Sequence, residues 1–266
     1  MEATYKSYPS NLSDACWAYL CPYLPAAKPG GRPRSVNLRA VVDAIFYVLR
    51  SGCAWRMLPG DLPVWQTVYS YFRNWQRAGV WERINRYLRE WVRRKARRRA
   101  SPSAAIIDSQ SVKIGSLTGN SCGFDGGKKV KGRKRHVLVD TLGLVILVVV
   151  TAANVSDKAG AEVLLKRLKG QKRLLARLLR IWADGGYRGE SFMQRVYDTC
   201  GWVIEVVLRT DQTSGFQVVP KRWVVERTFG WFGWSRRLGK DYEVRPENSE
   251  AFIYLAMSNI MLRRLA

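Results

Sequence analysis

Three acidic residues in this basic chain have types and positions suited to metal chemistry. Asp108 ends the apolar run IID at 106–108, and Asp184 ends IWAD at 181–184. Each is expected at the end of a buried strand, where the side chains of an open α/β sheet line the ligand-binding crevice. Two carboxylates at such an edge repel each other, and a hard divalent cation relieves that repulsion. If the two strands are neighbours, the sequence predicts a metal site.

Glu226 is the third candidate ligand, within KRWVVERTFGWFGWSRR at 221–237. With about 100° between successive helical residues, the side chains expected near it are Arg222, Gly230, Gly233 and Arg237. That surface would let a carboxylate face a metal while a phosphate backbone passes close by. Each acid alone is more often a cap, a surface residue or half of a salt bridge. The coincidence of three favours a catalytic metal site.

Other chemically capable residues are interpreted as structural. Asp140 is expected to open a hairpin turn and Asp157 to start a helix, both normal positions for aspartate. His136, the single histidine, is interpreted as a strand-edge residue rather than a catalytic base. The serines after Asp108 lack a GxSxG context and a suitable histidine, which argues against a serine nucleophile.

Composition restricts the function. The 266 residues include 45 Lys and Arg against 21 Asp and Glu, a net charge of +24, which indicates nucleic acid as the partner. Five scattered cysteines and one histidine argue against structural zinc. The N-terminal residues do not resemble a signal peptide, and the longest apolar run is too short for a bilayer. We therefore expect a bacterial, cytoplasmic and nucleoid-associated protein without a membrane partner.

Residues 1–100 are predicted to form a helical DNA-binding domain with a basic C-terminal helix. Apolar residues recur at helical spacing from Leu12 to about Trp91, and the connectors suit a helix-turn-helix arrangement. The third helix carries the polar side chains expected to contact DNA: Gln66, Thr67, Ser70, Arg73, Asn74 and Arg77. A helical bundle with a solvated polar face is an equally good interpretation of these residues alone.

Residues 101–266 are predicted to form a mixed α/β sheet flanked by helices. Strands are expected at 104–108, 135–140, 144–152, 177–184 and 202–209, and helices at 157–169, 188–200, around Glu226 and at 249–265. A basic cluster between the first two strands is either a solvated loop or, more plausibly, a phosphate grip: Lys128, Lys129, Lys131, Arg133, Lys134 and Arg135.

These segments resemble a known family. IIDSQSVK at 106–113, ADGGYRGE at 183–190 and RWVVERTFGWFGWSRRLGKDYE at 222–243 are similar to the three catalytic motifs of DDE transposases of bacterial insertion sequences, in the IS-five family. GKKVKGRKRHVLVDTLGL resembles the strand segment after the first motif. SGCAWRMLPGDLPVWQTVYSYFRNWQRAGVWERI resembles the helical DNA-binding domain of these proteins.

The resemblance implies an RNase H-like core in which Asp108, Asp184 and Glu226 hold two divalent ions, Mg²⁺ or Mn²⁺. It also implies binding of double-stranded DNA at terminal inverted repeats, followed by strand cleavage and strand transfer into target DNA by a homodimer. Two other classes stay open. A non-catalytic repressor would not need all three acids, and an RNase H-like nuclease would not need a separate base-reading domain.

The sequence departs from the family around its third acid. Related transposases carry Tyr, Arg, Glu and Lys there; Arg222 and Glu226 match, whereas Val219 stands at the tyrosine position and Gly233 at the lysine position. Trp234 also replaces an expected basic residue. Besides Arg222, the residues expected to contact DNA in this segment are Arg236, Arg237 and Lys240.

Overall fold

The computed structural model describes residues 6–27, 30, 34–115, 121–170, 175–208 and 221–266. Its N-terminal part is helical, as the apolar spacing predicts, with α1 Asp14–Leu20, α2 Leu38–Ser51, α3 Trp65–Arg77 and α4 Val80–Lys95. The Ser13 hydroxyl accepts a hydrogen bond from the backbone of Cys16 and caps α1. Gly52 ends α2 with a φ of 74°, a left-handed conformation that favours glycine.

The connection from α2 to α3 spans residues 52–64 and includes a 3-10 turn, Trp55–Met57. It is longer than the turn of about three to four residues in a helix-turn-helix. The short connection instead joins α3 to α4, through Ala78 and Gly79. The helical character of this half is confirmed, and its helix-turn-helix arrangement stays a prediction.

In the described part of the chain one sheet contains β1 Ala104–Lys113, β2 Gly123–Asp125, β3 Val130–Asp140, β4 Val145–Ala152, β5 Arg180–Ala183 and β6 Val203–Val206. β3 pairs antiparallel with both β1 and β4, whereas β5 is parallel to β1 and β6 is parallel to β5. Three antiparallel strands followed by two parallel ones give the order β4-β3-β1-β5-β6, which is the RNase H-like topology. The predicted mixed sheet is confirmed.

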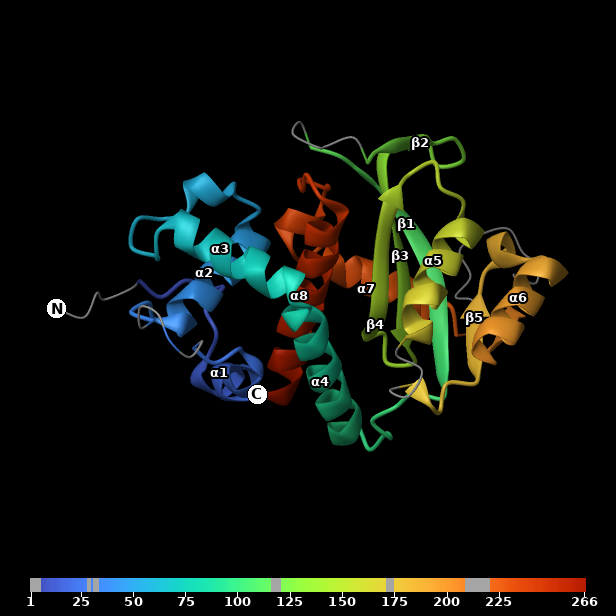
Figure 1. The fold of residues 1–266 in the computed structure, drawn as a ribbon, viewed down its shortest axis with the longest axis horizontal. Helices are drawn as coiled ribbons and strands as arrows, with labels where there is room; N and C mark the ends of the chain where they lie inside the picture. The colour runs from blue at the N-terminus through green and yellow to red at the C-terminus, as the bar shows by residue number, and fades with distance from the viewer. Residues whose placement is uncertain (1–5, 28–29, 31–33, 116–120, 171–174, 209–220) are drawn as a thin grey trace.

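Helices cover both faces of this sheet (Figure 1). α5 Asp157–Lys169 and α6 Glu190–Cys200 lie on one side, and α7 Trp223–Phe232 and α8 Pro246–Leu265 lie on the other. α8 starts at Pro246, earlier than the sequence predicts, because proline fits the first helical turn. In the described part of the chain no helix is long and apolar enough to cross a membrane.

α8 connects the helical half to the sheet. It packs against α4 and β4 and also contacts α1, α2 and α3. Its Phe252 ring stacks on Phe72 of α3 at 4.8 Å between centroids. From α4, the Asn85 amide donates to the Val145 carbonyl at 2.8 Å, and Arg89 donates to the same oxygen at 2.9 Å. One continuous hydrophobic core results, and the division into two domains near residue 100 stays a prediction.

Candidate active site

Asp108 and Asp184 lie at the same level on neighbouring strands. The parallel register of β1 and β5 pairs Ile106 with Trp182, and each aspartate comes two residues later. Because side chains alternate along a strand with a period of two, both aspartates belong to the same face. The condition on which the predicted metal site depends, that the two strands are neighbours, is met.

The two aspartates differ in their backbone setting. β5 ends at Ala183, and the Asp184 carboxylate accepts a hydrogen bond from the Gly186 N–H at 2.9 Å in the following 3-10 turn. β1 continues to Lys113, because β3 remains paired with it along that length. The prediction that Asp108 ends its strand is therefore wrong: it lies within β1, beyond the last residue paired with β5.

Glu226 approaches from α7, and a guanidinium lies between it and Asp184. Arg222 Nη2 is 3.8 Å from Asp184 Oδ2 and 3.9 Å from Glu226 Oε1. The side chains of Asp184 and Glu226 are 32% and 50% exposed, so both remain accessible to a ligand. The structure thus brings the three acids to one region around Arg222.

The environment of Asp108 disfavours its ionised form. Burial, and to a smaller degree the nearby Asp184 carboxylate, raise the pKa of Asp108 to about 6. The backbone N–H of Ser109, at 2.7 Å from Oδ1, and the charges of Arg222 and Lys128 oppose this rise only in part. A desolvated carboxylate beside a second carboxylate is stabilised in its ionised form by additional positive charge.

The carboxylate oxygens of these residues are suitable ligands for a divalent cation. In the described residues no three Cys, His, Asp or Glu side chains are close enough to hold an ion as they stand. Asp108 and Asp184 each use Oδ1 for a backbone N–H, and carboxylate oxygens are ligands that hard cations prefer. A cation would supply the positive charge that Asp108 lacks, and Arg222 would have to turn away from the acids.

Replacing Asp108 with asparagine is expected to stabilise the metal-free protein. Because the folded state raises the pKa of Asp108 from 3.8 to about 6, wild type loses stability as pH rises through this window. The free energy of unfolding of Asp108→Asn should exceed that of wild type only slightly below pH 4 and by about 1–3 kcal/mol above pH 6. Urea unfolding in EDTA at pH 4.5 and 7.5 measures it. The same change at the exposed Asp198 is the control. A stability gain in Asp108→Asn that does not depend on pH would contradict the raised pKa of Asp108.

The basic cluster divides into exposed and buried residues. Lys128, Lys129 and Lys131 are exposed around the turn between β2 and β3. The predicted phosphate contacts of Arg133, Lys134 and Arg135 are wrong, because all three are buried. Their charged groups have partners inside the protein.

Arg133 pairs with Asp241 at 3.2 Å, and both side chains are fully buried. Lys134 lies between Asp125 and Asp157, at 3.3 and 3.2 Å. Arg135 donates to the carbonyl of Leu238 at 2.9 Å. β3 is an internal strand, so these side chains are covered on both faces of the sheet. They hold the sheet to the segments packed on it.

The segment after Glu226 also departs from the prediction. α7 ends at Phe232, so the helical spacing does not extend to Arg237. Arg237 is buried and forms an ion pair with Glu243 at 2.6 Å, so its predicted positions beside Glu226 and on DNA are wrong. Arg236 and Lys240 are exposed. Val219 lies outside the described residues.

On α3 the predicted DNA contacts are accessible. Gln66, Ser70, Asn74 and Arg77 are exposed, and Thr67 and Arg73 are partly exposed. Arg73 donates one hydrogen bond to Asn248 of α8 at 3.0 Å. Their contact with DNA stays a prediction.

Two residues near the site were not predicted to be there. Asp157 starts α5, as expected, but it also accepts a hydrogen bond from the Ser109 hydroxyl at 2.7 Å. Tyr187 is fully buried in the turn after Asp184, and its hydroxyl has no hydrogen-bond partner in the described structure. Burial and the charges of Asp108 and the other nearby carboxylates raise the pKa of Tyr187. The only pattern in the sequence that could have indicated Tyr187 is its position three residues after Asp184, an aspartate at the end of a strand.

The interpretation of His136 as a strand-edge residue is wrong. It lies on β3 between β1 and β4 and is fully buried, with Nε2 3.0 Å from the Thr151 hydroxyl. Burial lowers the pKa of His136 to about 4. Asp140 does open the predicted turn, where it accepts hydrogen bonds from the backbones of Leu142 and Leu144. It also forms a buried ion pair with Arg93.

An RNase H-like sheet that carries two aspartates on adjacent strands and a glutamate on a later helix defines the class of DDE proteins. Residues 99–262 match the family model "Transposase DDE domain", and the chain belongs to this family. Residues 12–85 match a second model, "Putative transposase of IS4/5 family". The resemblance seen in the motifs is confirmed.

The chain is also similar to individual proteins. The "Putative transposase for insertion sequence element IS402" of Burkholderia cepacia is 30% identical over 128 residues, 47% of this chain; the match covers 60% of that protein's length. An IS402 "uncharacterized 16.2 kDa protein" from the same organism is 34% identical over 38% of this chain and 72% of its own length. The solved structure "Crystal structure of a pre-cleavage Mos1 transpososome" aligns over 91% of this chain and 80% of its own, with 12% identity and a TM-score of 0.30.

Proposed function

We propose that this protein binds the terminal inverted repeats of an insertion sequence, cleaves DNA there and transfers the freed end to target DNA, by a cut-and-paste route. The observation that carries the proposal is the meeting of Asp108, Asp184 and Glu226 around Arg222. It occurs in a chain of net charge +24 that belongs to the DDE transposase family.

Each residue of the site has a role in this proposal. Asp108, Asp184 and Glu226 would hold two divalent ions, Mg²⁺ or Mn²⁺. Such ions, when bound, activate the attacking water or 3′-hydroxyl and stabilise the leaving oxygen. Arg222, released from Asp184 and Glu226, is placed to bind the phosphate at the cleavage point. The single histidine is fully buried, so we assign the positioning to the carboxylates and the arginine.

Double-stranded DNA is the proposed partner, both as inverted repeats and as target. The accessible polar face of α3 would read the repeats, and exposed Lys128, Lys129, Lys131, Arg236 and Lys240 would contact phosphates. Because two element ends must be joined, we propose a homodimer on DNA. We place the protein with the nucleoid in the bacterial cytoplasm.

Neutralising the exposed lysines beside the site is expected to weaken DNA binding in a salt-dependent way. For Lys129→Gln combined with Lys131→Gln, the slope of log affinity against log salt should fall by about 1.8, or about 0.9 per lost phosphate contact. Fluorescence anisotropy from 50 to 300 mM KCl measures the slope. The matched control neutralises exposed Lys166 and Lys169 on α5. An equal effect from the control would show a general charge effect and no contact at this turn.

Cleavage of labelled duplexes tests the proposed function. DNA carrying the element's own ends is incubated with Mg²⁺, Mn²⁺ or EDTA, beside the same duplex with scrambled repeats. Metal-dependent cleavage restricted to the repeat boundary is the expected result. Binding without cleavage would favour a repressor, and cleavage without sequence preference would favour a nuclease.

A further inference from the structure

A fourth carboxylate faces the candidate active site from α5. Asp157 is the first residue of this helix, directly after the capping residue Ser156. The helix packs against the turn Gly185–Tyr187, which follows Asp184. A methyl group placed on Gly186 would lie 3.0 Å from Asp184 Oδ1 and 3.7 Å from Asp157 Oδ2. The two carboxylates therefore approach the same point beside this glycine.

The two oxygens of Asp157 have different surroundings. Oδ1 accepts a hydrogen bond from the Ser109 hydroxyl at 2.7 Å and lies 3.2 Å from Lys134 Nζ. Oδ2, the oxygen near Gly186, has no hydrogen-bond or ion-pair partner in the described part of the chain. The side chain is 30% exposed, so a ligand can reach it. The protein thus orients this carboxylate through one oxygen and leaves the other free.

A buried hydroxyl without a partner lies close to the same acids. Tyr187 is fully buried, and within the described residues its hydroxyl makes no hydrogen bond. Burial raises the pKa of Tyr187 most, and the charges of Asp108, Asp157 and Asp184 raise it further. Buried polar groups in native proteins normally have partners. The hydroxyl therefore indicates a polar ligand among these acids, such as a hydrated cation.

Asp125 shows how an aspartate with a structural role differs in this region. It holds Lys134 from the other side, at 3.3 Å. Its Oδ2 also accepts the Ser111 hydroxyl, and its Oδ1 accepts two backbone N–H groups of the turn between β2 and β3. Donors from the protein occupy both oxygens of Asp125. Asp157 shares the lysine but keeps an oxygen for a ligand.

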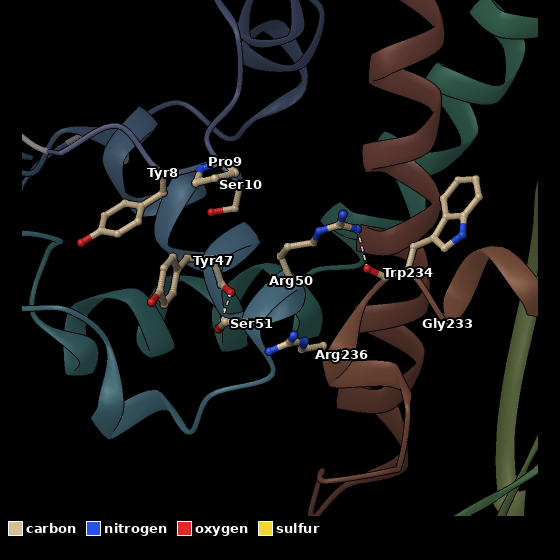
Figure 2. A pocket seen from close by; sticks show the side chains of 9 residues that line it. All are labelled: Tyr8, Pro9, Ser10, Tyr47, Arg50, Ser51, Gly233, Trp234 and Arg236. Atoms are coloured by element: carbon tan, nitrogen blue, oxygen red, sulfur yellow. Dashed lines mark hydrogen bonds between the residues drawn. The ribbon is translucent and has the colours of Figure 1, made fainter.

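A cation has no comparable site in the pocket beside α2. This pocket, of about 420 Å³, lies between the helical half and the segment that follows α7 (Figure 2). The described residues that line it include Arg50 and Arg236 and no acid. Like charges repel, so a divalent cation is not expected there. The acids of the candidate active site instead offer the carboxylate oxygens that hard cations prefer.

We propose that Asp157 is a fourth acid of the candidate active site, and that its free Oδ2 helps to hold a divalent cation beside Asp184. This inference rests on the proposed function, because it assumes that Asp108, Asp184 and Glu226 bind the cations of the reaction. It gives Asp157 a role beyond the start of α5. A further negative charge at the site strengthens its attraction for a divalent cation.

Titration with Mn²⁺ tests the proposal without a measurement of activity. Electron paramagnetic resonance of free Mn²⁺ gives the dissociation constant for the protein in the absence of DNA. In Asp157→Asn this constant should rise about tenfold, within the range of about 10- to 100-fold for groups that support a metal site. Asparagine keeps an oxygen for the Ser109 hydroxyl, so the start of α5 should survive. Asp157→Ser repeats the test if the asparagine variant does not fold.

The matched control is Asp125→Asn, which also removes one negative charge and one partner of Lys134. Its dissociation constant for Mn²⁺ should stay within about twofold of wild type, because both Asp125 oxygens are bound by the protein. The rise in unfolding temperature caused by Mn²⁺ is a second measurement. It is taken relative to the metal-free value of each variant, so a difference in basal stability does not affect the comparison.

Asp184→Asn separates this inference from the proposed function. If Asp184→Asn loses Mn²⁺ binding while Asp157→Asn binds like wild type, Asp157 is not part of the site and the proposed function stands. Equal weakening by Asp157→Asn and Asp125→Asn would show an effect through Lys134 and would also overturn the inference. If wild type and Asp184→Asn bind Mn²⁺ equally, the proposed function fails first.

Discussion

Replacing Asp184 with asparagine is expected to slow DNA cleavage about a thousandfold, or about 4 kcal/mol in activation free energy. Asparagine has nearly the same size, and its carbonyl oxygen can still accept the Gly186 N–H that Asp184 accepts at 2.9 Å. The local turn should therefore survive, whereas the negative charge needed to hold a cation is lost. Single-turnover cleavage of an end-labelled duplex in Mn²⁺ measures the rate.

DNA binding should survive this change. Removal of one negative charge near the phosphates should leave the affinity of Asp184→Asn equal to or slightly above that of wild type. The matched control is Asp198→Asn, because Asp198 is an exposed aspartate on α6; it should cleave at the wild-type rate. A loss of DNA affinity in Asp184→Asn together with the loss of cleavage would point to misfolding. Wild-type cleavage by the variant would remove Asp184 from the site.

Replacing Asp241 with alanine is expected to destabilise the fold by about 3–5 kcal/mol, because it leaves a buried arginine without its partner. Arg133 and Asp241 are both fully buried, with 3.2 Å between Nη1 and Oδ1. Asp241 also accepts hydrogen bonds from the Glu243 backbone and the Ser249 hydroxyl. Arg133 keeps carbonyl acceptors at Glu243 and Val244 but loses its carboxylate partner, and the Glu243 N–H and the Ser249 hydroxyl lose this acceptor at the same time. The midpoint of urea unfolding, followed by tryptophan fluorescence, measures the change.

An exposed ion pair supplies the control. Asp14 pairs with Arg39 at 2.6 Å, but the Asp14 side chain is 94% exposed. Asp14→Ala should therefore change stability by less than about 1 kcal/mol. If the Asp241 and Asp14 variants unfold at the same urea concentration, the Arg133–Asp241 pair is not a structural anchor.

Local patterns in the sequence were sufficient to predict most elements. Ser13 caps the start of α1, Gly52 ends α2, and Asp157 starts α5, as their capping chemistry predicts. The turn at Asp140 was also predictable, because its hydrogen bonds are made within a few residues. The expectation that Asp108 and Asp184 lie close together depended on one assumption, that their strands are neighbours, and the pairing of β1 with β5 meets that assumption. Short-range hydrogen bonds and periodicity carry this information.

Contacts between distant segments could not be predicted from local patterns. KGRKRH looks like a solvated basic loop, but Arg133 and Arg135 are buried by partners more than 100 positions later in the sequence. The end of α7 at Phe232 was also missed, since WFGWSRR continues the helical spacing. The polar contacts after it, from Arg50 to Trp234 and from Arg237 to Glu243, favour a tighter turn. Which charges face solvent is decided by the tertiary fold.

The position of α8 gives the protein an order of assembly during synthesis. The apolar surfaces of α1 to α4 are completed by a helix that follows the entire sheet in the sequence. While the chain is still on the ribosome, the helical half has no α8 to pack against and is left with exposed apolar surface. A copy of the gene interrupted before α8 would therefore yield a chain that is a target for proteases, rather than a stable DNA-binding fragment that competes with the intact protein.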